Sequence, residues 1–379
     1  MQSQSEATRG AASAPGRRSG GAGLSNPPTV SIVIPVRNEE RFIGRCLESV
    51  FAQDCDMSAV EVVVVDGRSA DRSREIVKGF AARHPNLKLV DNPRRHVPAA
   101  MNLGIQSCTG ELIIRLDAHG EYARDYVRRC VETAVRTGAE LVGGILIVQP
   151  GADTLMARTI QVFQGHRLGM GGASHRVGGH EGPADTVPFG CFRRDALAQV
   201  GLFDERLIRS QDNEMVARIQ AAGGQVWFNP QIINYYYARP TLRGWLGMLY
   251  INGSWHTYLM RILPSAFRLR YLVPLAFVLI VCGGALAGLV WPPAWWAAAA
   301  TLGSHLVLSL LASVQLASRH GWDLMLTLPW FFPLCHLWYG AATFMGMFRY
   351  CLVAVGQRPE PSRPERAVWT PPESKSHSA

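Results

Sequence analysis

Short apolar runs alternate with amphipathic stretches over the first third of the chain, after an N-terminal segment rich in Ser, Gly, Ala and Arg. Val30–Pro35, Val62–Val65 and Glu111–Leu116 are largely apolar runs, which is typical of strands buried on both faces. Between them, Arg41–Gln53 and Asp71–His84 carry apolar residues at helical spacing. This alternation predicts an α/β fold built on a doubly wound sheet.

The pattern is less regular in the middle of the chain. Gly165–Gly182, with many glycines and three histidines, predicts a mobile loop. Other short runs predict further strands and helices. The additional predicted strands are Lys88–Val90, Leu141–Val148, Val187–Phe192 and Val226–Phe228, and the additional predicted helices are Pro98–Gln106, Arg193–Val200 and Gln211–Ala222.

The last third of the chain is strongly apolar. Leu242–Leu263 is amphipathic and aromatic, so residues 241–270 are predicted to form helices at a membrane interface. Three long apolar segments follow, and the third is interrupted by prolines. Residues 271–350 are therefore predicted to be a transmembrane region with two or three membrane segments. These segments are Tyr271–Val290, Ala294–Ala317 and Leu324–Met347.

Arginines flank these segments and indicate their orientation. Arg261, Arg270 and Arg319 place their flanks in the cytoplasm, which predicts a multi-pass protein of the inner (plasma) membrane with a cytoplasmic catalytic domain. A third full crossing would put the arginine-bearing tail outside. A re-entrant third segment would instead return the tail to the cytoplasm, and both topologies remain open.

The composition and charge of the chain limit the kinds of binding partner that are expected. The net charge is +9 and 48% of residues are hydrophobic, but no long Lys/Arg run has interleaved aromatics. An anionic membrane surface is therefore expected, and no nucleic acid. Eight cysteines without a Cys-x-x-Cys pair predict reduced, mostly buried thiols. Residues 1–28 lack the apolar core of a signal peptide and are predicted to be a disordered tail, and residues 351–379 a flexible one.

Polar residues follow the predicted strands at their carboxyl ends. Asn38 and Glu39 follow the first strand, Asp66 ends the second and Asp117 follows a third. In a parallel sheet these ends line one edge, where open α/β folds bind ligands. Carboxylates there suit a divalent metal and the ribose and base of a nucleotide. The edge therefore predicts a nucleotide-diphosphate site.

Five motifs occur in the order found in a known family. The chain resembles the family 2 glycosyltransferases, whose GT-A fold is a nucleotide-diphospho-sugar-binding mixed sheet, and the match covers about Thr29–Asn234 within a predicted domain of residues 29–240. The apolar tail and the Asp-Ala-His variant are similar to bacterial enzymes of succinoglycan-type exopolysaccharide assembly. The motifs are Pro35–Glu40, Val65–Asp71, Ala99–Gly104, Leu116–His119 and Gln211–Glu214.

The resemblance implies a set of nucleotide-sugar contacts. Gly67 stands where many relatives have a second aspartate, so contact with the base rests on Asp66. Asp71 is expected to cap a helix instead. Glu39 could alternatively be a carboxylate favoured by a helix N-terminus. The implied nucleotide-sugar-binding residues are Pro35, Asn38, Glu39, Asp66, Asn102 and Asp117.

Asp117 and His119 occupy the positions of the family's Asp-x-Asp metal motif. Residues at i and i+2 after a strand both reach one diphosphate-bound ion, which implies Mn²⁺ or Mg²⁺ as cofactor. An imidazole ligand shifts the preference toward Mn²⁺. In the alternative, His119 only hydrogen-bonds a phosphate and Asp117 alone binds the metal.

Asp212 resembles the catalytic base, in a motif where Gln211 replaces the usual glutamate. Capping of a helix is the alternative for Asp212. Glu214 and Arg218 are possible acceptor or diphosphate contacts, together with Gln211. One helical turn apart, Glu214 and Arg218 could equally pair with each other.

The predicted function is an inverting glycosyltransferase that moves a hexose from a UDP-sugar to a polyprenyl-diphosphate-linked oligosaccharide. A polyprenyl-phosphate glycosyltransferase and a processive polysaccharide synthase are alternatives. Thr241–Trp245 departs from the Gln-x-x-Arg-Trp motif of processive synthases, which disfavours the latter. From another class, the chain could be an inactive nucleotide-binding membrane scaffold.

Overall fold

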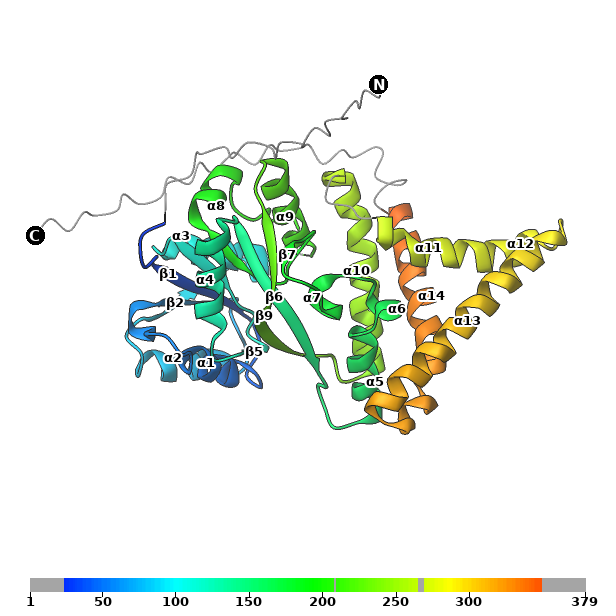
Figure 1. Ribbon diagram of the computed structural model, residues 1–379, viewed down its shortest axis with the longest axis horizontal. Coiled ribbons are helices and arrows are strands. Elements are labelled where there is room, and N and C mark those ends of the chain that lie inside the picture. The colour runs from blue at the N-terminus through cyan, green and yellow to red at the C-terminus, as the bar shows by residue number, and fades with distance from the viewer. Residues whose placement is uncertain (1–23, 208, 265–268, 350–379) are drawn as a thin grey trace, which may run out of the picture.

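The computed structural model describes residues 24–207, 209–264 and 269–349. Figure 1 shows a sheet with helices on both sides, followed by a helical region from which a pair of helices projects. The predicted tails lie mostly outside the described residues. The end of the N-terminal one is ordered, however, because the Ser25 amide donates to Glu111 Oε1 at 2.9 Å. The prediction of disorder up to residue 28 is therefore wrong for its last residues.

The described strands form one mixed sheet in the order β3-β2-β1-β4-β8-β6-β9-β5, with β7 paired to β9. Strands β1 to β4 are parallel, whereas β8 runs antiparallel to both β4 and β6. The strands are β1 (Val30–Val36), β2 (Glu61–Asp66), β3 (Leu87–Asp91), β4 (Leu112–Arg115), β5 (Gly120–Tyr122), β6 (Leu141–Gln149), β7 (Gly182–Pro183), β8 (Cys191–Arg193) and β9 (Val226–Tyr237).

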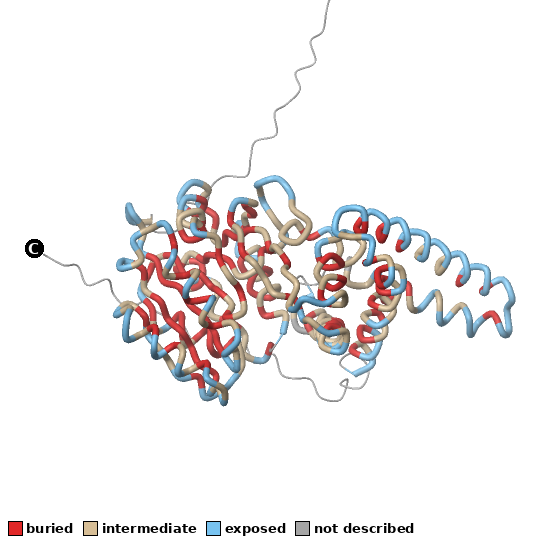
Figure 2. Tube along the Cα trace, turned by 90° about the horizontal axis from the view of Figure 1, so that it is seen from below, coloured by how far each residue is buried: buried red, intermediate tan, exposed pale blue. Residues whose placement is uncertain are grey.

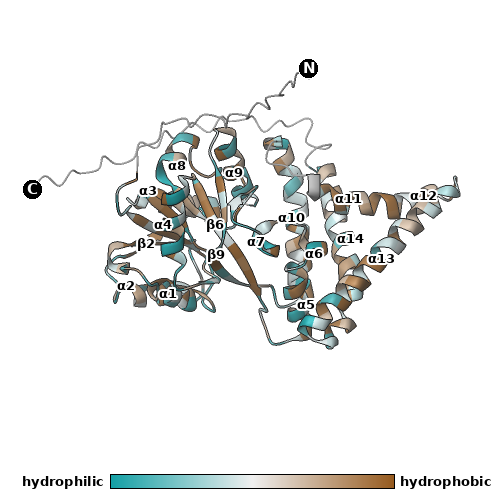
Figure 3. Cartoon of the chain, in the orientation of Figure 1, coloured by the Kyte–Doolittle hydropathy of each residue, from teal (hydrophilic) through white to brown (hydrophobic). Residues whose placement is uncertain are grey.

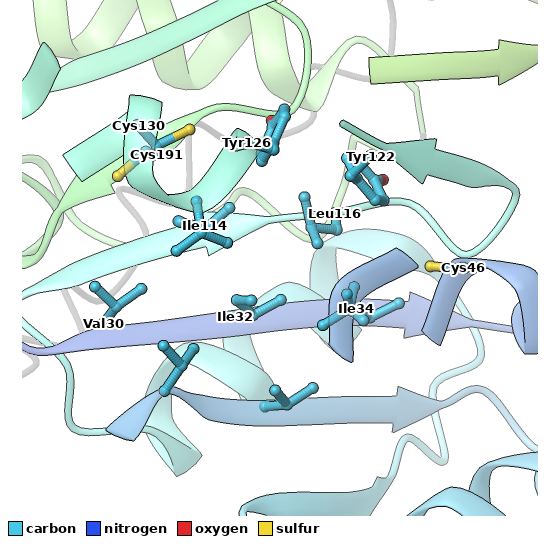
Figure 4. Close-up of a cluster of buried hydrophobic side chains, with 14 of the residues drawn as sticks. Val30, Ile32, Ile34, Cys46, Ile114, Leu116, Tyr122, Tyr126, Cys130 and Cys191 are labelled. Carbon is cyan, nitrogen blue, oxygen red and sulfur yellow. The ribbon is translucent and has the colours of Figure 1, made fainter. Parts of the chain in front are cut away.

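Helices cover both faces of this sheet, as the alternation predicts. Successive residues of β1 point to opposite faces, so Ile32 and Ile34 pack in one core and Val33 in the other. Figure 4 shows Ile32, Ile34 and Cys46 within the first core. That core packs against α1 (Ile43–Phe51), α2 (Ser73–Ala81) and α4 (Tyr126–Thr137), and the second packs against α3 (Val97–Ser107), α8 (Arg194–Val200) and α9 (Gln211–Ala221).

The middle of the chain is more regular than its pattern suggests. Gly165–Gly182 contains two short helices, α6 (Arg167–Met170) and α7 (Ser174–Val177), so this predicted loop is partly helical. Strand β9 continues far beyond Phe228, with a register shift opposite Gly143 and Ile145 of β6. Polar residues interrupt its apolar pattern, which is why the sequence predicts only its start.

A third core joins the sheet domain to the helical region. Trp245 is fully buried there and contacts Phe163 and Cys335. Trp245 therefore packs inside the protein, although it lies in the segment 241–270 that is predicted to lie at a membrane interface. The surrounding helices are α5 (Leu155–Gln164), α10 (Leu242–Ile262), α13 (Pro293–His320), the 3₁₀ helix Trp322–Leu326 and α14 (Leu328–Met347).

A helical hairpin projects from this third core (Figures 1 and 2). Its first leg is α11 (Val273–Val278), a π-helical turn and α12 (Gly284–Ala287), and its second leg is α13. A Cβ at Gly288 would lie 2.0 Å from the Trp295 ring, so only glycine permits this close approach of the legs. The indole of Trp295 donates to the Ala285 carbonyl at 2.9 Å and closes the hairpin tip.

Within the described residues, α13 alone is long and apolar enough to cross a membrane. The run Val273–Ala287 is too short, because the chain turns at the tip. Helix α14 buries Phe331, Phe332 and Cys335 in the third core instead of presenting an apolar surface all round. Three separate membrane crossings, or two, are therefore not supported.

Candidate active site at the strand ends

The turns after β1 and β2 are fastened to each other. Asn38 has a positive φ of 56°, its amide donates to Ser69 Oγ at 3.0 Å, and its Oδ1 accepts from the Ala70 amide at 2.8 Å. Asp71 accepts from the Glu40 and Ser73 amides. Asn38 and Asp71 thus hold the edge of the sheet in shape. Arg72, and not Asp71, occupies the N-cap position of α2, so the capping role expected for Asp71 is wrong.

Glu39 reaches from this edge toward the candidate metal motif. Its amide donates to Ser73 Oγ at 2.7 Å, and its carboxylate lies 3.4 Å from His119 Nδ1. Pro35 is buried in β1 opposite Val65 and shapes the strand end rather than exposing a polar group. The structure therefore brings Glu39 and His119 together.

Asp66 is placed at the predicted strand end but is already engaged. Only 1% of the surface of Asp66 is exposed, and its carboxylate accepts hydrogen bonds from Ser69 Oγ at 2.6 Å and from Arg74 Nη1 at 3.1 Å. Contact with a nucleotide base would compete with these two partners. Its role in base binding stays a prediction.

Asn102 makes a bridge on the other face of the sheet. Its Nδ2 donates to the Phe203 carbonyl at 2.9 Å and to Glu205 Oε1 at 3.0 Å, and its Oδ1 accepts from the Phe203 amide at 2.9 Å. Both ends of the amide are used to hold α3 against the segment before α9. The structure therefore gives Asn102 a structural role, and its contact with the nucleotide-sugar stays a prediction.

Arg115, at the end of β4, joins the two predicted catalytic carboxylates. Its Nη2 donates to Asp117 Oδ1 at 3.1 Å, and its Nη1 donates to Asp212 Oδ1. Its side chain is almost completely buried, whereas 37% of the Asp212 side chain is exposed. One guanidinium therefore fixes the candidate metal ligand and the candidate base side by side, although they lie far apart in sequence.

The turn before β8 encloses Arg115. Phe189 and Gly190 both have positive φ values, 58° and 86°, and the Gly190 carbonyl accepts from the Arg115 amide at 2.9 Å. The guanidinium carbon lies 5.7 Å from the centre of the Phe189 ring. A phenylalanine in the left-handed region is strained, and such strain is often concentrated at functional sites.

Burial and neighbouring charges shift the pKa values of Asp212 and His119 in opposite directions. Burial raises the pKa of Asp212 and Asp117 adds to this effect, while Arg115 opposes it. Burial disfavours a charged His119, but Glu39 and Asp117 outweigh it and raise the pKa of His119. Asp212 is therefore a stronger base than a free aspartate, yet Arg115 still favours its charged form.

The residues present fit a metal that is completed by substrate oxygens. Across the described ranges, no three His, Cys, Asp or Glu side chains gather as a metal centre. Asp117 commits only Oδ1 to Arg115. Mg²⁺-like ions are commonly held by one or two carboxylates together with substrate phosphates, which matches this arrangement.

Helix α9 carries Asp212 in its first turn but is not capped by it, since Ser210 occupies the N-cap position. The capping interpretation is therefore wrong. Glu214 pairs with Arg218 at 2.6 Å, and Arg218 also donates to the carbonyls of Val200 and Gly201. This pair fastens α9 to the end of α8, which confirms the pairing alternative. Gln211 is buried and its Oε1 has no partner.

Sequence reasoning missed Arg115. A charged residue inside the apolar run Glu111–Leu116, two positions before Asp117, was the available signal. Its partner Asp212 comes from a distant helix, so the pairing itself depends on the fold.

Comparisons with known proteins identify the family. The profile of the family described as Glycosyl transferase family 2 matches residues 31–201. The succinoglycan biosynthesis protein ExoA of Rhizobium meliloti (strain 1021) is 33% identical over 277 residues, which are 71% of this chain and 82% of that protein. A dolichyl N-acetyl-alpha-D-glucosaminyl phosphate 3-beta-D-2,3-diacetamido-2,3-dideoxy-beta-D-glucuronosyltransferase of Methanococcus voltae is 27% identical, covering 69% of this chain and 82% of that protein.

A solved structure shares the fold. The mannosyltransferase PcManGT from Pyrobaculum calidifontis, in complex with GDP-Man and Mn²⁺, superposes with a TM-score of 0.55 at 21% identity, covering 85% of this chain and 88% of that chain. The mixed α/β sheet is therefore a GT-A-like fold, as the motifs predict.

Proposed function

The chain belongs to the family 2 glycosyltransferases, and on this premise we propose that it transfers a hexose with inversion from a UDP-sugar to a lipid-linked oligosaccharide. The bridge from Asp117 through Arg115 to Asp212 carries the proposal. It sets a general base beside the place where the departing diphosphate is held. Direct displacement with inversion needs the base and the departing diphosphate on opposite faces of the anomeric carbon.

The step follows from these positions. The acceptor hydroxyl gives its proton to Asp212 while its oxygen forms a bond to the anomeric carbon. The bond from that carbon to the diphosphate oxygen breaks on the opposite face, and the nucleoside diphosphate leaves with the electron pair. Direct displacement inverts the carbon, so an α-linked donor gives a β-linkage. Arg115 keeps Asp212 charged and oriented without touching the sugar.

Asp117, with His119, would hold the divalent ion against the diphosphate. When bound, Mn²⁺ or Mg²⁺ supplies Lewis-acid stabilisation of the negative charge on the leaving group. The Mn²⁺ that accompanies GDP-Man in the PcManGT complex supports this part of the proposal. Because Glu39 competes for His119, Asp117 is the principal ligand in our proposal.

The lipid-linked acceptor is supported by the relative named for transfer to a dolichyl-linked sugar phosphate. Another relative is named for succinoglycan biosynthesis. A role in cell-surface glycan or exopolysaccharide assembly follows for this chain.

The projecting hairpin supports attachment to a membrane. In the most apolar window of α13 only 22% of residues are buried, unlike a core helix of a soluble protein. Leu289 and Val290 at the tip are 74% and 90% exposed, and Trp291 and Trp296 lie beside them. Figure 3 shows the apolar colouring of these helices. We propose that the hairpin enters the cytoplasmic side of the inner membrane.

Transfer assays test the proposed function. The purified full chain, given UDP- and GDP-hexoses and a polyprenyl-diphosphate-linked oligosaccharide, should form one longer lipid-linked product by mass. Asp212→Asn should lower turnover by about 10² to 10⁴. Asp153→Asn, an exposed carboxylate in the loop between β6 and α5, is the matched control. Near-normal turnover of Asp212→Asn would exclude Asp212 as the base.

A further inference from the structure

Tyr122, the last residue of β5, holds the main chain of Asp117 with its hydroxyl. The hydroxyl accepts a hydrogen bond from the Asp117 amide at 2.7 Å and donates one to the Asp117 carbonyl at 3.0 Å. Only 5% of Tyr122 is exposed, and its ring meets the Tyr126 ring edge-on at 5.0 Å (Figure 4). A buried side chain therefore fixes both main-chain polar groups of the candidate metal ligand.

The Asp117 carbonyl receives two further donors. The Gly120 amide donates to it at 3.1 Å, and the Cys46 thiol at 3.6 Å. Ser49 joins Tyr122 to the same helix, because its hydroxyl accepts from the Tyr122 amide at 3.2 Å and donates to the Cys46 carbonyl at 2.7 Å. Helix α1 and strand β5 therefore hold this turn from two sides.

The turn leaves little room beside the Tyr122 hydroxyl. A Cβ at Gly120 would lie 2.9 Å from Tyr122 Oη and 3.4 Å from the Asp117 carbonyl oxygen. A larger residue at this position would push the hydroxyl away from the main chain that it holds. Gly120 therefore permits the contact between Tyr122 and Asp117.

Asp117 is held both at its side chain and at its main chain. Arg115 Nη2 donates to one carboxylate oxygen at 3.1 Å, and the Tyr122 hydroxyl bonds the amide and the carbonyl. Groups that orient metal ligands without touching the metal typically change its affinity by about 10- to 100-fold when they are removed. The contact of Tyr122 with Asp117 has the form of such an orienting interaction.

We propose that Tyr122 is a positioning residue for the divalent ion of sugar transfer. Its hydroxyl sets the turn from Asp117 to His119 in the conformation that holds the ion against the donor diphosphate. This inference rests on the proposed function, in which Asp117 is the principal metal ligand. In this role Tyr122 acts through the main chain of Asp117 and touches neither the ion nor the sugar.

Tyr126 provides a matched control for the Tyr122 hydroxyl. Its side chain is fully buried beside Tyr122 in the same core, but its hydroxyl makes no hydrogen bond to the turn that carries Asp117. Tyr122→Phe and Tyr126→Phe each remove one buried oxygen atom and keep the ring. A role in packing alone would therefore affect the two variants alike, whereas a positioning role depends on the Tyr122 hydroxyl.

Binding of Mn²⁺ to the purified full chain tests this role, with saturating UDP present and the electron paramagnetic resonance signal of free Mn²⁺ as the readout. Tyr122→Phe should weaken Mn²⁺ binding roughly 10-fold or more, because the main chain of Asp117 loses the hydroxyl. Gly120→Ala should also weaken it, since the added methyl group displaces the hydroxyl instead of removing it. Tyr126→Phe should bind Mn²⁺ as the wild type does.

Kinetics and thermal unfolding separate positioning from folding. Transfer by Tyr122→Phe should need more Mn²⁺ for its half-maximal rate and should regain the wild-type rate at high Mn²⁺. A lower unfolding temperature of Tyr122→Phe with unchanged Mn²⁺ affinity would overturn the proposal, as would an equal loss of affinity in Tyr126→Phe. If the wild-type protein bound no Mn²⁺ with UDP, the proposed metal role would fail, and this inference with it.

Discussion

At the scale of single residues, Arg115 decides how the site works. It is buried between Asp117 and Asp212 and is covered by Phe189. Without its charge, two carboxylates would face each other in a partly buried site, and one of them would take up a proton. Its effect on transfer therefore acts through the two aspartates.

Replacing Arg115 tests this role. Arg115→Met should lower turnover by about 10² or more, since a protonated Asp212 cannot accept the acceptor proton. Arg115→Lys should recover part of the loss because it restores a charge without the two-pronged geometry. Turnover is measured at saturating donor, with thermal unfolding of each variant as control. Equal turnover of the Met and Lys variants would contradict an electrostatic role.

Metal removal tests Asp117 and His119. Chelation with EDTA should abolish transfer and Mn²⁺ should restore it, because Asp117 offers one carboxylate oxygen to an ion shared with the diphosphate. Asp117→Asn should not be restored by Mn²⁺, whereas His119→Ala should need only a higher Mn²⁺ concentration, since Glu39 already competes for the imidazole. Full activity after rigorous chelation would refute the metal requirement.

Whether the sequence alone can identify a site residue depends on which residues its side chain contacts. Asp117 and Asp212 stand in motifs with local signals, and the structure places both at Arg115. Asn102 stands in an equally clear motif, but its partners are the main chain of Phe203 and the side chain of Glu205. Partners contributed by segments far away in the chain leave no local pattern.

At the scale of elements, strands were more predictable than the segments that pack on them. The runs of β1, β2 and β4 are plain in the sequence, because both of their faces are buried. Helix α4 was missed although Tyr126, Val127 and Cys130 give it an apolar face. The extension of β9 depends on pairing with β6 and β5, which sequence patterns do not record.

Helices α10 and α14 pack closely against each other at Gly346. A Cβ at Gly346 would lie 2.5 Å from Thr257 Oγ1 and 2.7 Å from the Ser254 main chain. Gly346→Leu should therefore separate the helices and lower stability by about 1–3 kcal/mol. Thermal unfolding in detergent measures this effect. Gly247→Leu, at a position with open space around it, is the matched control and should unfold near the wild-type temperature.

At the scale of the whole molecule, the sheet domain and the helical region share one core. Phe163 of α5 belongs to the sequence-predicted domain of residues 29–240 but packs against Trp245, Phe331 and Phe332. A boundary at residue 240 therefore divides a core. The sequence could not reveal this, because an apolar face on α5 does not show what covers it.

Truncation tests the shared core. A chain ending at residue 240 should expose Phe163 and Ile160 and aggregate in the absence of detergent, whereas deletion of residues 284–298 removes only the hairpin tip and should leave a folded protein. Size-exclusion chromatography and near-UV circular dichroism distinguish the two outcomes. A monodisperse, folded fragment 1–240 would contradict the coupling.

The packing of the two ends of the hairpin predicts one membrane topology. Its first leg starts with α11 packed against α14, and its second leg ends in the third core, so Arg261, Arg319 and Arg349 should all lie on the side of the catalytic domain. Cys282, an exposed cysteine of the hairpin, should react with a lipid-soluble maleimide and resist a water-soluble one. A tag after residue 379 should remain inaccessible from outside intact cells. Labelling of that tag from outside would favour a third crossing instead.

The length of the hairpin also links the enzyme to the thickness of the membrane. Helix α13 is about 42 Å long, and the hydrocarbon core of a bilayer is about 30 Å thick. Its last turns, including Leu316 and Ala317, pack in the same core as α5 and α10. When acyl chains shorten or lengthen, α13 must tilt to match them. Such a tilt would act on that core, which α13 shares with α5 of the sheet domain, so bilayer thickness becomes a physical variable of sugar transfer.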